Sequence, residues 1–461
     1  MSGKTFVVEN PATLEPIQEV ADLGVSDAIS AVDAAHAAFP EWASTAPRRR
    51  SDVLRKAFEL MLRDRDRLAT LISRENGKSI ADATAEVTYA AEFFRWFSEE
   101  AVRPGGDYGE SPAGGTRTIV THRPVGVAAL VTPWNFPAAM ATRKIGPALA
   151  AGCTAVLKPA EETPLTAFAV GELLLEAGLP EGALQIVPTT DAPSVVGAWL
   201  DDARVRKISF TGSTGVGRQL LKQAAERVVN ASMELGGNAP FVVAEDADLD
   251  AAVAGAMIAK FRNGGQACTA ANRLYVHASV AREFSDRLGA AIEKLVVGSA
   301  LDGAEIGPLI TARALQRTTA TLEQAIDAGA RVAAQAQLPD LPGHFLAPTL
   351  LTDVDPGAAV VNDELFAPIA PVVTWEDDEQ LLGYVNSSEY GLAAYVFSGD
   401  LKRAISLAER FDAGMVGVNR GLVSDPAAPF GGVKQSGLGR EGAREGLLAF
   451  TETQYLSVDW S

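Results

Sequence analysis

The stretch of sequence that decides the fold begins with Val127-Ala-Ala-Leu-Val131 and the turn Thr132-Pro-Trp-Asn-Phe-Pro137, and it continues through Ala138–Ala151 to Ala155-Val-Leu157. Two short apolar strands are separated here by a tight turn and one helical run. Apolar strands without alternation are typical of a parallel sheet covered by helices on both faces, because parallel neighbours need a crossover connection. This part of the chain therefore predicts an α/β fold.

The same alternation of strand and helix extends toward the C-terminus. Further strands are expected at Leu184–Val187, Lys207–Phe210 and Arg227–Met233, and helices at Leu165–Ala177, Ala192–Leu200 and Gly215–Ala225. A second series of strands is expected at Phe241–Val243, Leu274–Val276, Val332–Ala334, Val372–Trp375, Tyr395–Phe397 and Met415–Val418. We therefore expect two doubly wound parallel-sheet domains that join near Gly236-Gly237.

The segments on either side of this core have different patterns. Residues 26–104 are periodic as helices, with runs at Ala28–Phe39, Ser51–Arg74 and Ile80–Ala101. After a break rich in Gly and Pro, Thr116–Arg123 alternates as an exposed hairpin arm does. The end of the chain, Ala449–Trp460, alternates again and is expected to pair as a strand with the arm of a neighbouring subunit.

Composition and charge exclude several classes of protein. The 461 residues carry a formal net charge of −18, which argues against a nucleic-acid or anionic-membrane partner. The sequence contains no recognisable signal peptide or membrane span. Two distant cysteines, Cys153 and Cys268, indicate a reducing, cytoplasmic setting and no disulfide framework. The four histidines have no metal-ligand spacing, so no metal is expected.

One of the two cysteines has surroundings suited to catalysis. Cys268 ends the run Asn263-Gly-Gly-Gln-Ala-Cys268, where glycines allow close approach of a substrate and leave amides free for an oxyanion. Glu234 stands at an apolar strand end, where burial would raise its pKa toward that of a general base. Asn135 lies on a turn from which its amide could donate to an oxyanion. A buried small side chain, an exposed carboxylate and a helix cap remain the respective alternatives.

Two further turns suit a dinucleotide. Phe210-Thr-Gly-Ser-Thr-Gly-Val-Gly217 follows a strand and opens a helix, whose free amides and positive end favour a pyrophosphate. Lys158-Pro-Ala-Glu161 closes another strand of the same sheet, at the edge where ligands of such sheets lie. A lysine there can donate to ribose hydroxyls, and a carboxylate can accept from the 2′-hydroxyl while it repels a 2′-phosphate. A plain strand–helix turn and a solvated loop remain the alternatives.

In their order and spacing these motifs resemble the aldehyde dehydrogenase superfamily over essentially the whole chain. The resemblance implies that Cys268 is the nucleophile, Glu234 the base and Asn135 the side-chain oxyanion donor. The residues that it places on NAD are Trp134, Lys158, Glu161, Gly212, Ser213, Glu364 and Phe366. It also implies an NAD-binding domain at residues 1–105 and 125–236, a catalytic domain at 237–438 and an oligomerisation arm at 106–124 and 439–461.

Within the superfamily the sequence is most similar to succinate-semialdehyde dehydrogenases. The segments that carry this likeness are Met140-Ala-Thr-Arg-Lys144, Lys260-Phe-Arg-Asn263 and Gly414–Ser424, which runs on into Pro429–Arg440. The likeness implies that Arg143, Arg262 and Ser424 hold the distal carboxylate of the substrate, a role suited to guanidinium forks. For each arginine, an internal ion pair or a solvated side chain remains the alternative.

Three positions depart from these relatives. Ala270 stands where some of them carry a second cysteine, so we expect no disulfide switch at the active site. Ala367 replaces the usual glycine of Phe-Gly-Pro, which leaves the geometry beside the nicotinamide open. Arg420 could add a contact for the acid or tune selectivity toward a longer one. Glu161 favours NAD, and weaker use of NADP stays open.

The expected reaction is the NAD-dependent oxidation of succinate semialdehyde to succinate, through a cysteine hemithioacetal and a thioester that is hydrolysed with the glutamate base. Dehydrogenases of glutarate semialdehyde, of another ω-semialdehyde or of a general aliphatic aldehyde are alternatives, as is a CoA-acylating enzyme. A thiol hydrolase and a non-catalytic binding protein on the same fold are more remote. The arm and the terminal strand predict a homodimer or homotetramer.

Overall fold

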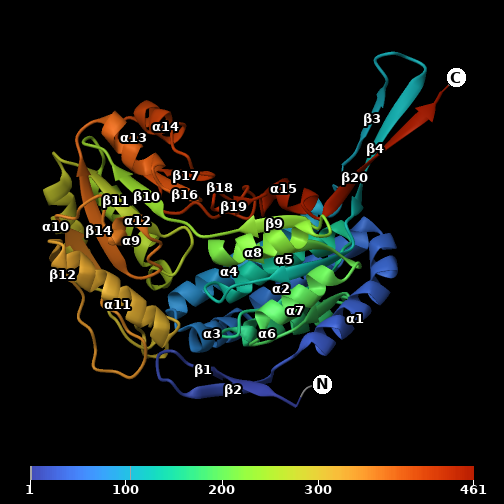
Figure 1. Cartoon of the computed structure of the whole chain (residues 1–461), viewed down its shortest axis with the longest axis horizontal. Coiled ribbons are helices and arrows are strands. Elements are labelled where there is room, and N and C mark those ends of the chain that lie inside the picture. Colours follow the sequence, from blue (N-terminus) through green and yellow to red (C-terminus); the bar gives the residue numbers. More distant parts are fainter. Residues whose placement is uncertain (1–2, 104, 461) are drawn as a thin grey trace.

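The computed structural model describes residues 3–103 and 105–460 of the chain. Residues 1, 2, 104 and 461, which the expected NAD-binding and arm segments include, lie outside the described residues. Figure 1 shows two lobes side by side, with a three-stranded arm projecting from one of them and a two-stranded hairpin beneath. No helix in the described ranges is long and apolar enough to cross a membrane.

The first lobe is built on a six-stranded sheet. In spatial order its strands are β19 (Gly437–Leu438), β9 (Asn230–Glu234), β8 (Val205–Thr211), β5 (Val127–Val131), β6 (Thr154–Lys158) and β7 (Leu184–Ile186). The strands from β9 to β7 are parallel to their neighbours. At the edge, β19 pairs antiparallel with β9, so the chain returns to this sheet after building the second lobe.

Helices cover both faces of the first sheet. They are α1 (Val25–Ser44), α2 (Pro47–Arg63), α3 (Arg65–Asn76), α4 (Ile80–Glu100), α5 (Pro137–Ala151), α6 (Pro164–Glu176), α7 (Ala192–Asp201) and α8 (Thr214–Ala225). Ala128 and Leu130 of β5 belong to the core shared with α2–α6, whereas Val127, Ala129 and Val131 belong to the core shared with α1, α7 and α8. A strand buried on both faces needs apolar residues at every position, which explains the continuous apolar runs in the sequence.

The second lobe contains a seven-stranded sheet. In spatial order its strands are β12 (Arg331–Gln335), β13 (Thr349–Thr352), β14 (Ile369–Trp375), β11 (Ala271–His277), β10 (Ala239–Val243), β16 (Ala393–Phe397) and β17 (Met415–Val418). Its helices are α9 (Leu249–Phe261), α10 (Ala281–Ile292), α11 (Ala312–Asp327), α12 (Ala359–Asn362), α13 (Asp378–Asn386) and α14 (Leu401–Ala408).

One strand of the second sheet contradicts the expectation of parallel pairing. The run Val332–Ala334 lies in β12, which pairs antiparallel with β13 at the edge of the sheet. β13 itself, Thr349-Leu-Leu-Thr352, was not predicted because four residues give too little pattern to distinguish a strand from a loop. The predicted helix Ser51–Arg74 is also divided, because the backbone leaves the helical conformation at Asp64 between α2 and α3.

The remaining strands form the arm, the N-terminal hairpin and a small bridge. They are β1 (Thr5–Glu9), β2 (Pro16–Ala21), β3 (Asp107–Glu110), β4 (Thr116–Pro124), β15 (Tyr390–Gly391), β18 (Val433–Lys434) and β20 (Thr451–Asp459), the last preceded by α15 (Ala443–Leu448). The prediction that the terminal strand pairs with a neighbouring subunit is wrong. β20 pairs along its whole length with β4 of its own chain, because Phe450 already bonds the backbone of Val125 at the base of the arm.

Candidate active site

The loop that carries Cys268 is held in an unusual conformation directly after α9. Asn263, Gly264 and Gly265 have positive φ angles of 52°, 60° and 75°, so three successive left-handed residues turn the chain. At Gly265 a Cβ atom would collide with the carbonyl group of Ala367, which makes glycine necessary there. The turn leaves Cys268 half-buried at the junction of the two lobes.

The thiol of Cys268 lies in a mixed electrostatic environment. Burial raises its pKa to about 11, and the positive charge of Arg143 is the strongest opposing influence. Glu364 and Glu234 raise the pKa further, and Arg262 lowers it. Because only the thiolate is an effective nucleophile, a proton must leave this sulfur during the reaction.

Asn135 is brought next to the cysteine loop, although 133 positions separate the two residues in sequence. Its side-chain Nδ2 donates to the carbonyl group of Gln266 at 3.2 Å. Its own carbonyl group accepts from Asn263 Nδ2 at 2.8 Å and from Lys78 Nζ at 2.7 Å. The Asn135 amide is therefore fixed beside the segment that carries the thiol, where an oxyanion donor is required.

Glu234 ends β9 and is almost completely buried. Neither carboxylate oxygen has a hydrogen-bond partner within the described part of the chain. Burial, followed by the charge of Glu441, raises its pKa well above the usual value, while Arg143, Lys144 and Arg440 act in the opposite direction. A carboxyl group of raised pKa becomes a stronger base once it is ionised, which suits the activation of water.

A buried cluster beside Glu234 was not predicted. Lys144 Nζ forms an ion pair with Glu441 Oε1 and donates to Ser209 Oγ at 3.0 Å. Arg143 Nε lies 2.7 Å from the other carboxylate oxygen of Glu441. Although burial raises the pKa of Glu441, Lys144 and Arg143 hold it below its usual value. The buried cluster therefore shifts the pKa values of the two glutamates in opposite directions, that of Glu441 down and that of Glu234 up.

The three residues predicted to bind the distal carboxylate lie around one tyrosine. Burial raises the pKa of Tyr89, and the nearby positive charges of Arg143 and Arg262 and the side chain of Ser424 lower it. The guanidinium of Arg143 lies over the ring of Phe430, and that of Arg262 over the ring of Phe136. The structure therefore brings together groups from α4, α5, the turn after α9 and the loop after β17. Arg420, by contrast, is exposed.

The residues predicted to bind NAD lie at the carboxyl edge of the first sheet and on the facing lobe. Lys158 ends β6, and burial lowers its pKa. Ser213 precedes α8, whose first-turn amides receive no side-chain cap and are available to a phosphate. Gly212 occupies the same turn. Glu161, in the turn before α6, is exposed.

From the second lobe, Glu364 and Phe366 face this edge. The ring of Phe366 meets that of Trp134 edge-on at 5.6 Å. Glu364 Oε1 accepts from the amide of Gly237 at 3.0 Å, and burial raises its pKa to about 7. Ala367 is completely buried, and its carbonyl group faces Gly265. The free amides of α8 and the paired aromatic rings fit a pyrophosphate and a planar ring, respectively.

Comparison with known proteins identifies the family. A sequence model described as the aldehyde dehydrogenase family matches residues 1–456. The chain belongs to this family. It is 52% identical over 433 residues to a succinate-semialdehyde dehydrogenase of Paenarthrobacter nicotinovorans, covering 94% of this chain and 96% of that protein.

A second curated relative and a solved structure are also similar to this aldehyde dehydrogenase. It is 46% identical to a glutarate-semialdehyde dehydrogenase of Pseudomonas putida, over 99% of this chain and 95% of that protein. The crystal structure of an Escherichia coli NADP-dependent enzyme superposes with a TM-score of 0.97 at 44% identity, covering 99% of this chain and 95% of that chain. The α/β fold and the family resemblance predicted from sequence are therefore confirmed.

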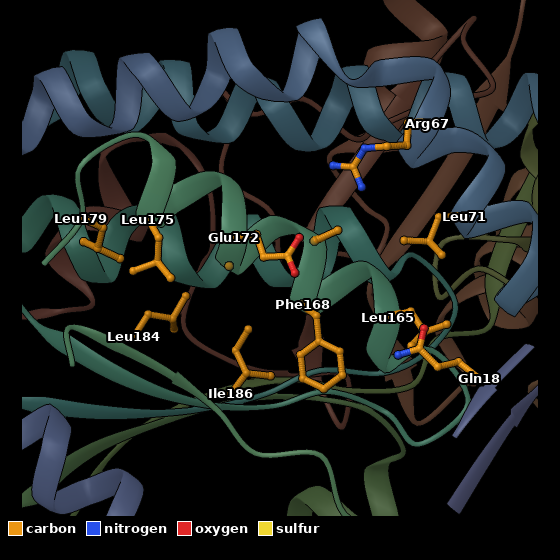
Figure 2. A pocket seen from close by; sticks show the side chains of 12 residues that line it. Gln18, Arg67, Leu71, Leu165, Phe168, Glu172, Leu175, Leu179, Leu184 and Ile186 are labelled. Atoms are coloured by element: carbon orange, nitrogen blue, oxygen red, sulfur yellow. The ribbon is translucent and has the colours of Figure 1, made fainter. Parts of the chain in front are cut away.

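A groove of about 550 Å³ lies elsewhere on this aldehyde dehydrogenase, between α3, α6 and β7. Figure 2 shows Phe168, Leu184 and Ile186 in the gap between helix and strand, with Glu172 and Arg67 at its margin. None of the predicted site residues lines this groove, and its lining contains no cysteine, serine or histidine. The groove therefore adds nothing to the catalytic centre.

Proposed function

We propose that this aldehyde dehydrogenase oxidises succinate semialdehyde to succinate with NAD. The observation that carries the proposal is the pair of arginines, Arg143 and Arg262, which lie with Ser424 around Tyr89 and whose positive charges oppose the raised pKa of the Cys268 thiol. A substrate with an aldehyde at one end and a carboxylate at the other can reach both groups at once. The name of the Paenarthrobacter relative and its 52% identity support the same substrate.

The chemistry follows from the proposed roles of three residues. The Cys268 thiol loses its proton to solvent water. The thiolate sulfur then bonds to the carbonyl carbon, and the resulting alkoxide is held by the Asn135 amide and the Cys268 backbone N–H. Bound NAD would supply a hydride acceptor, and loss of the hydride from the adduct carbon would leave a thioester on the sulfur. Ionised Glu234 then takes a proton from water, whose oxygen attacks the thioester carbon. The carbon–sulfur bond breaks, succinate leaves, and the proton held by Glu234 returns to the sulfur to restore the thiol.

We also propose that Lys158, Gly212 and Ser213 hold the dinucleotide with Glu161, and that Trp134, Glu364 and Phe366 hold its nicotinamide end. Residues 1–105 and 125–236 would then form the NAD-binding domain and 237–438 the catalytic domain. Residues 106–124 and 439–461 would supply the oligomerisation arm. The strands β3, β4 and β20 within these ranges project away from both lobes, which supports assembly into a homodimer or homotetramer. A cytoplasmic location fits the two unpaired cysteines.

A panel of aldehydes assayed with NAD tests the substrate. We expect kcat/KM to be highest for succinate semialdehyde and about 10- to 200-fold lower for glutarate semialdehyde, which adds one methylene. Butyraldehyde has the same chain length without the carboxylate and should be at least about 100-fold poorer, because both arginines lose their partner.

The same panel separates the alternatives. Preference for glutarate semialdehyde would assign the activity of the Pseudomonas putida relative to this chain. Equal kcat/KM for succinate semialdehyde and butyraldehyde would remove both arginines from substrate binding, and the enzyme would then act on general aliphatic aldehydes. A strict requirement for CoA would identify an acylating dehydrogenase.

Replacement of Glu161 tests the choice between NAD and NADP. We expect Glu161→Ser to shift the ratio of kcat/KM values at least about tenfold toward NADP, because a 2′-phosphate no longer meets a carboxylate. Steady-state kinetics with both dinucleotides measure the ratio. Glu172→Ser removes an equally exposed carboxylate from α6 and should leave the ratio unchanged. An unaltered ratio in Glu161→Ser would place the selectivity elsewhere.

A further inference from the structure

A completely buried ion pair lies behind the turn that carries Asn135. Lys78 is in the connection between α3 and α4, and Glu86 is on the second turn of α4. Their Nζ and Oε2 atoms are 2.6 Å apart, and both side chains have an exposed fraction of 0%. A pair so far from water is costly to desolvate, and apolar side chains of similar size would stabilise the fold at least as well. Its presence therefore calls for another explanation.

The pair holds the Asn135 turn from both ends. Lys78 Nζ donates to the carbonyl group of Asn135 at 2.7 Å and lies 4.0 Å from the centre of the Phe136 ring. Glu86 Oε1 accepts from the amides of Ala138 at 2.9 Å and Ala139 at 3.3 Å, at the start of α5. A single ion pair thus fixes the backbone at Asn135 and at the start of α5, on both sides of Phe136-Pro137.

The same connection also reaches the neighbouring loops. Asn76 Nδ2 donates to the carbonyl group of Trp134 at 3.0 Å. Asp82 accepts from the backbone amide of Asn263 at 2.8 Å, at the start of the turn that leads to Cys268. Residues 76–86 therefore contact both the turn that carries Asn135 and the loop that carries Cys268.

We propose that Lys78 and Glu86 are positioning residues, which set the Asn135 amide at the place where the oxygen of the Cys268 adduct develops its charge. This inference rests on the role proposed above for Asn135. The ion pair supplies two fixed hydrogen-bonding directions that an apolar pair could not supply. Displacement of a catalytic group by about 1 Å can lower the rate about 100-fold, so loss of the contacts that hold Asn135 should lower kcat measurably.

The test is a double-mutant cycle between the ion pair and Asn135. Lys78→Met/Glu86→Gln removes both charges together, so that no buried charge is left without a partner, and glutamine can still accept from the start of α5. We expect this double variant to lower kcat for the aldehyde about 10- to 100-fold, with the KM for NAD unchanged. Asn135→Ala alone should lower kcat about 100- to 1,000-fold.

The decisive measurement is the effect of the double variant in the Asn135→Ala background. If Lys78 and Glu86 act through Asn135, the added loss of kcat there should be less than about threefold. An equal loss in both backgrounds would overturn the inference, because the pair would then act on something other than Asn135. If Asn135→Ala itself left kcat unchanged, the proposed role of Asn135 would fail first, which separates the two failures.

A control is available at the opposite end of α5. Arg50 is buried and donates to the carbonyl group of Ala150 at 3.0 Å. Arg50→Met should lower the thermal midpoint yet leave kcat per folded enzyme unchanged. A kcat loss in Arg50→Met as large as that of the ion-pair variant would show that general loosening of α5 suffices, and it would also overturn the inference. Thermal unfolding of each variant fixes the folded fraction.

Discussion

Cys268→Ala should abolish aldehyde-dependent reduction of NAD, with a fall in kcat of at least about 10,000-fold. Without the sulfur no covalent adduct forms, and Asn135 and Glu234 have no alkoxide or thioester to act on. The measurement is the absorbance of NADH under saturating succinate semialdehyde. The Cys268→Ala variant should still bind NAD, because the dinucleotide is proposed to contact other residues. Quenching of tryptophan fluorescence measures this binding.

The second cysteine provides a matched control. Cys153 is completely buried in the first lobe, and burial raises its pKa to about 11. Cys153→Ala should retain full turnover, so that any loss in Cys268→Ala belongs to position 268. Full turnover in Cys268→Ala would contradict the proposed mechanism. Esterase activity of the natural protein without NAD reduction on any aldehyde would instead indicate a thiol hydrolase.

Replacement of Arg143 and of Arg262 by glutamine should have different effects on kcat/KM for the two aldehydes. Arg262→Gln should lower kcat/KM for succinate semialdehyde about 30- to 1,000-fold and leave butyraldehyde unaffected, since Arg262 has no ion pair within residues 3–103 and 105–460. Arg143→Gln should lower kcat/KM for both aldehydes. Its guanidinium also pairs with Glu441, whose buried charge would keep Lys144 as its positively charged partner.

Steady-state kinetics on both aldehydes, combined with thermal unfolding, distinguish these outcomes. Arg143→Gln should lower the thermal midpoint, whereas Arg262→Gln should change it little. An identical loss on succinate semialdehyde and butyraldehyde for Arg262→Gln would mean that this arginine supports the loop instead of the substrate. If Arg143→Gln oxidised butyraldehyde with unchanged kinetics, the ion pair between Arg143 and Glu441 would not be required for catalysis.

Much of the fold could be predicted because the central strands are buried on both faces. β5, with residues Val127–Val131, has the predicted bounds, since five apolar residues between a glycine and a turn admit few other structures. The N-terminal hairpin was missed because its residues alternate weakly and include Pro16. The partner of β20 could not be chosen from sequence, because alternation defines a strand but does not indicate which chain it joins.

In the candidate site, too, residues within local sequence motifs could be predicted, whereas contacts between residues far apart in the sequence could not. Cys268, Glu234 and Asn135 stand in local motifs that left alternatives open one by one, and the order and spacing of these motifs along the chain selected the three residues through the family resemblance. Glu441 contacts Lys144 across 297 positions, and no feature near either residue indicates the other. Tyr89 looks like any core-facing aromatic of a helix until the fold places Arg143 and Ser424 beside it. Groups that acquire their role only from long-range packing need the structure.

The return of β19 to the first sheet has a consequence for how the protein is made. Glu234 is paired through its backbone with Gly437, and the amide of Leu235 donates to the carbonyl group of Ser436. The edge of the first lobe is therefore supplied by β19, whose Gly437 follows Glu234 by 203 positions and is synthesised after the second lobe. A nascent chain that already contains all of β5 to β9 must therefore wait for the synthesis of the whole second lobe before Glu234 gains its backbone partner on β19.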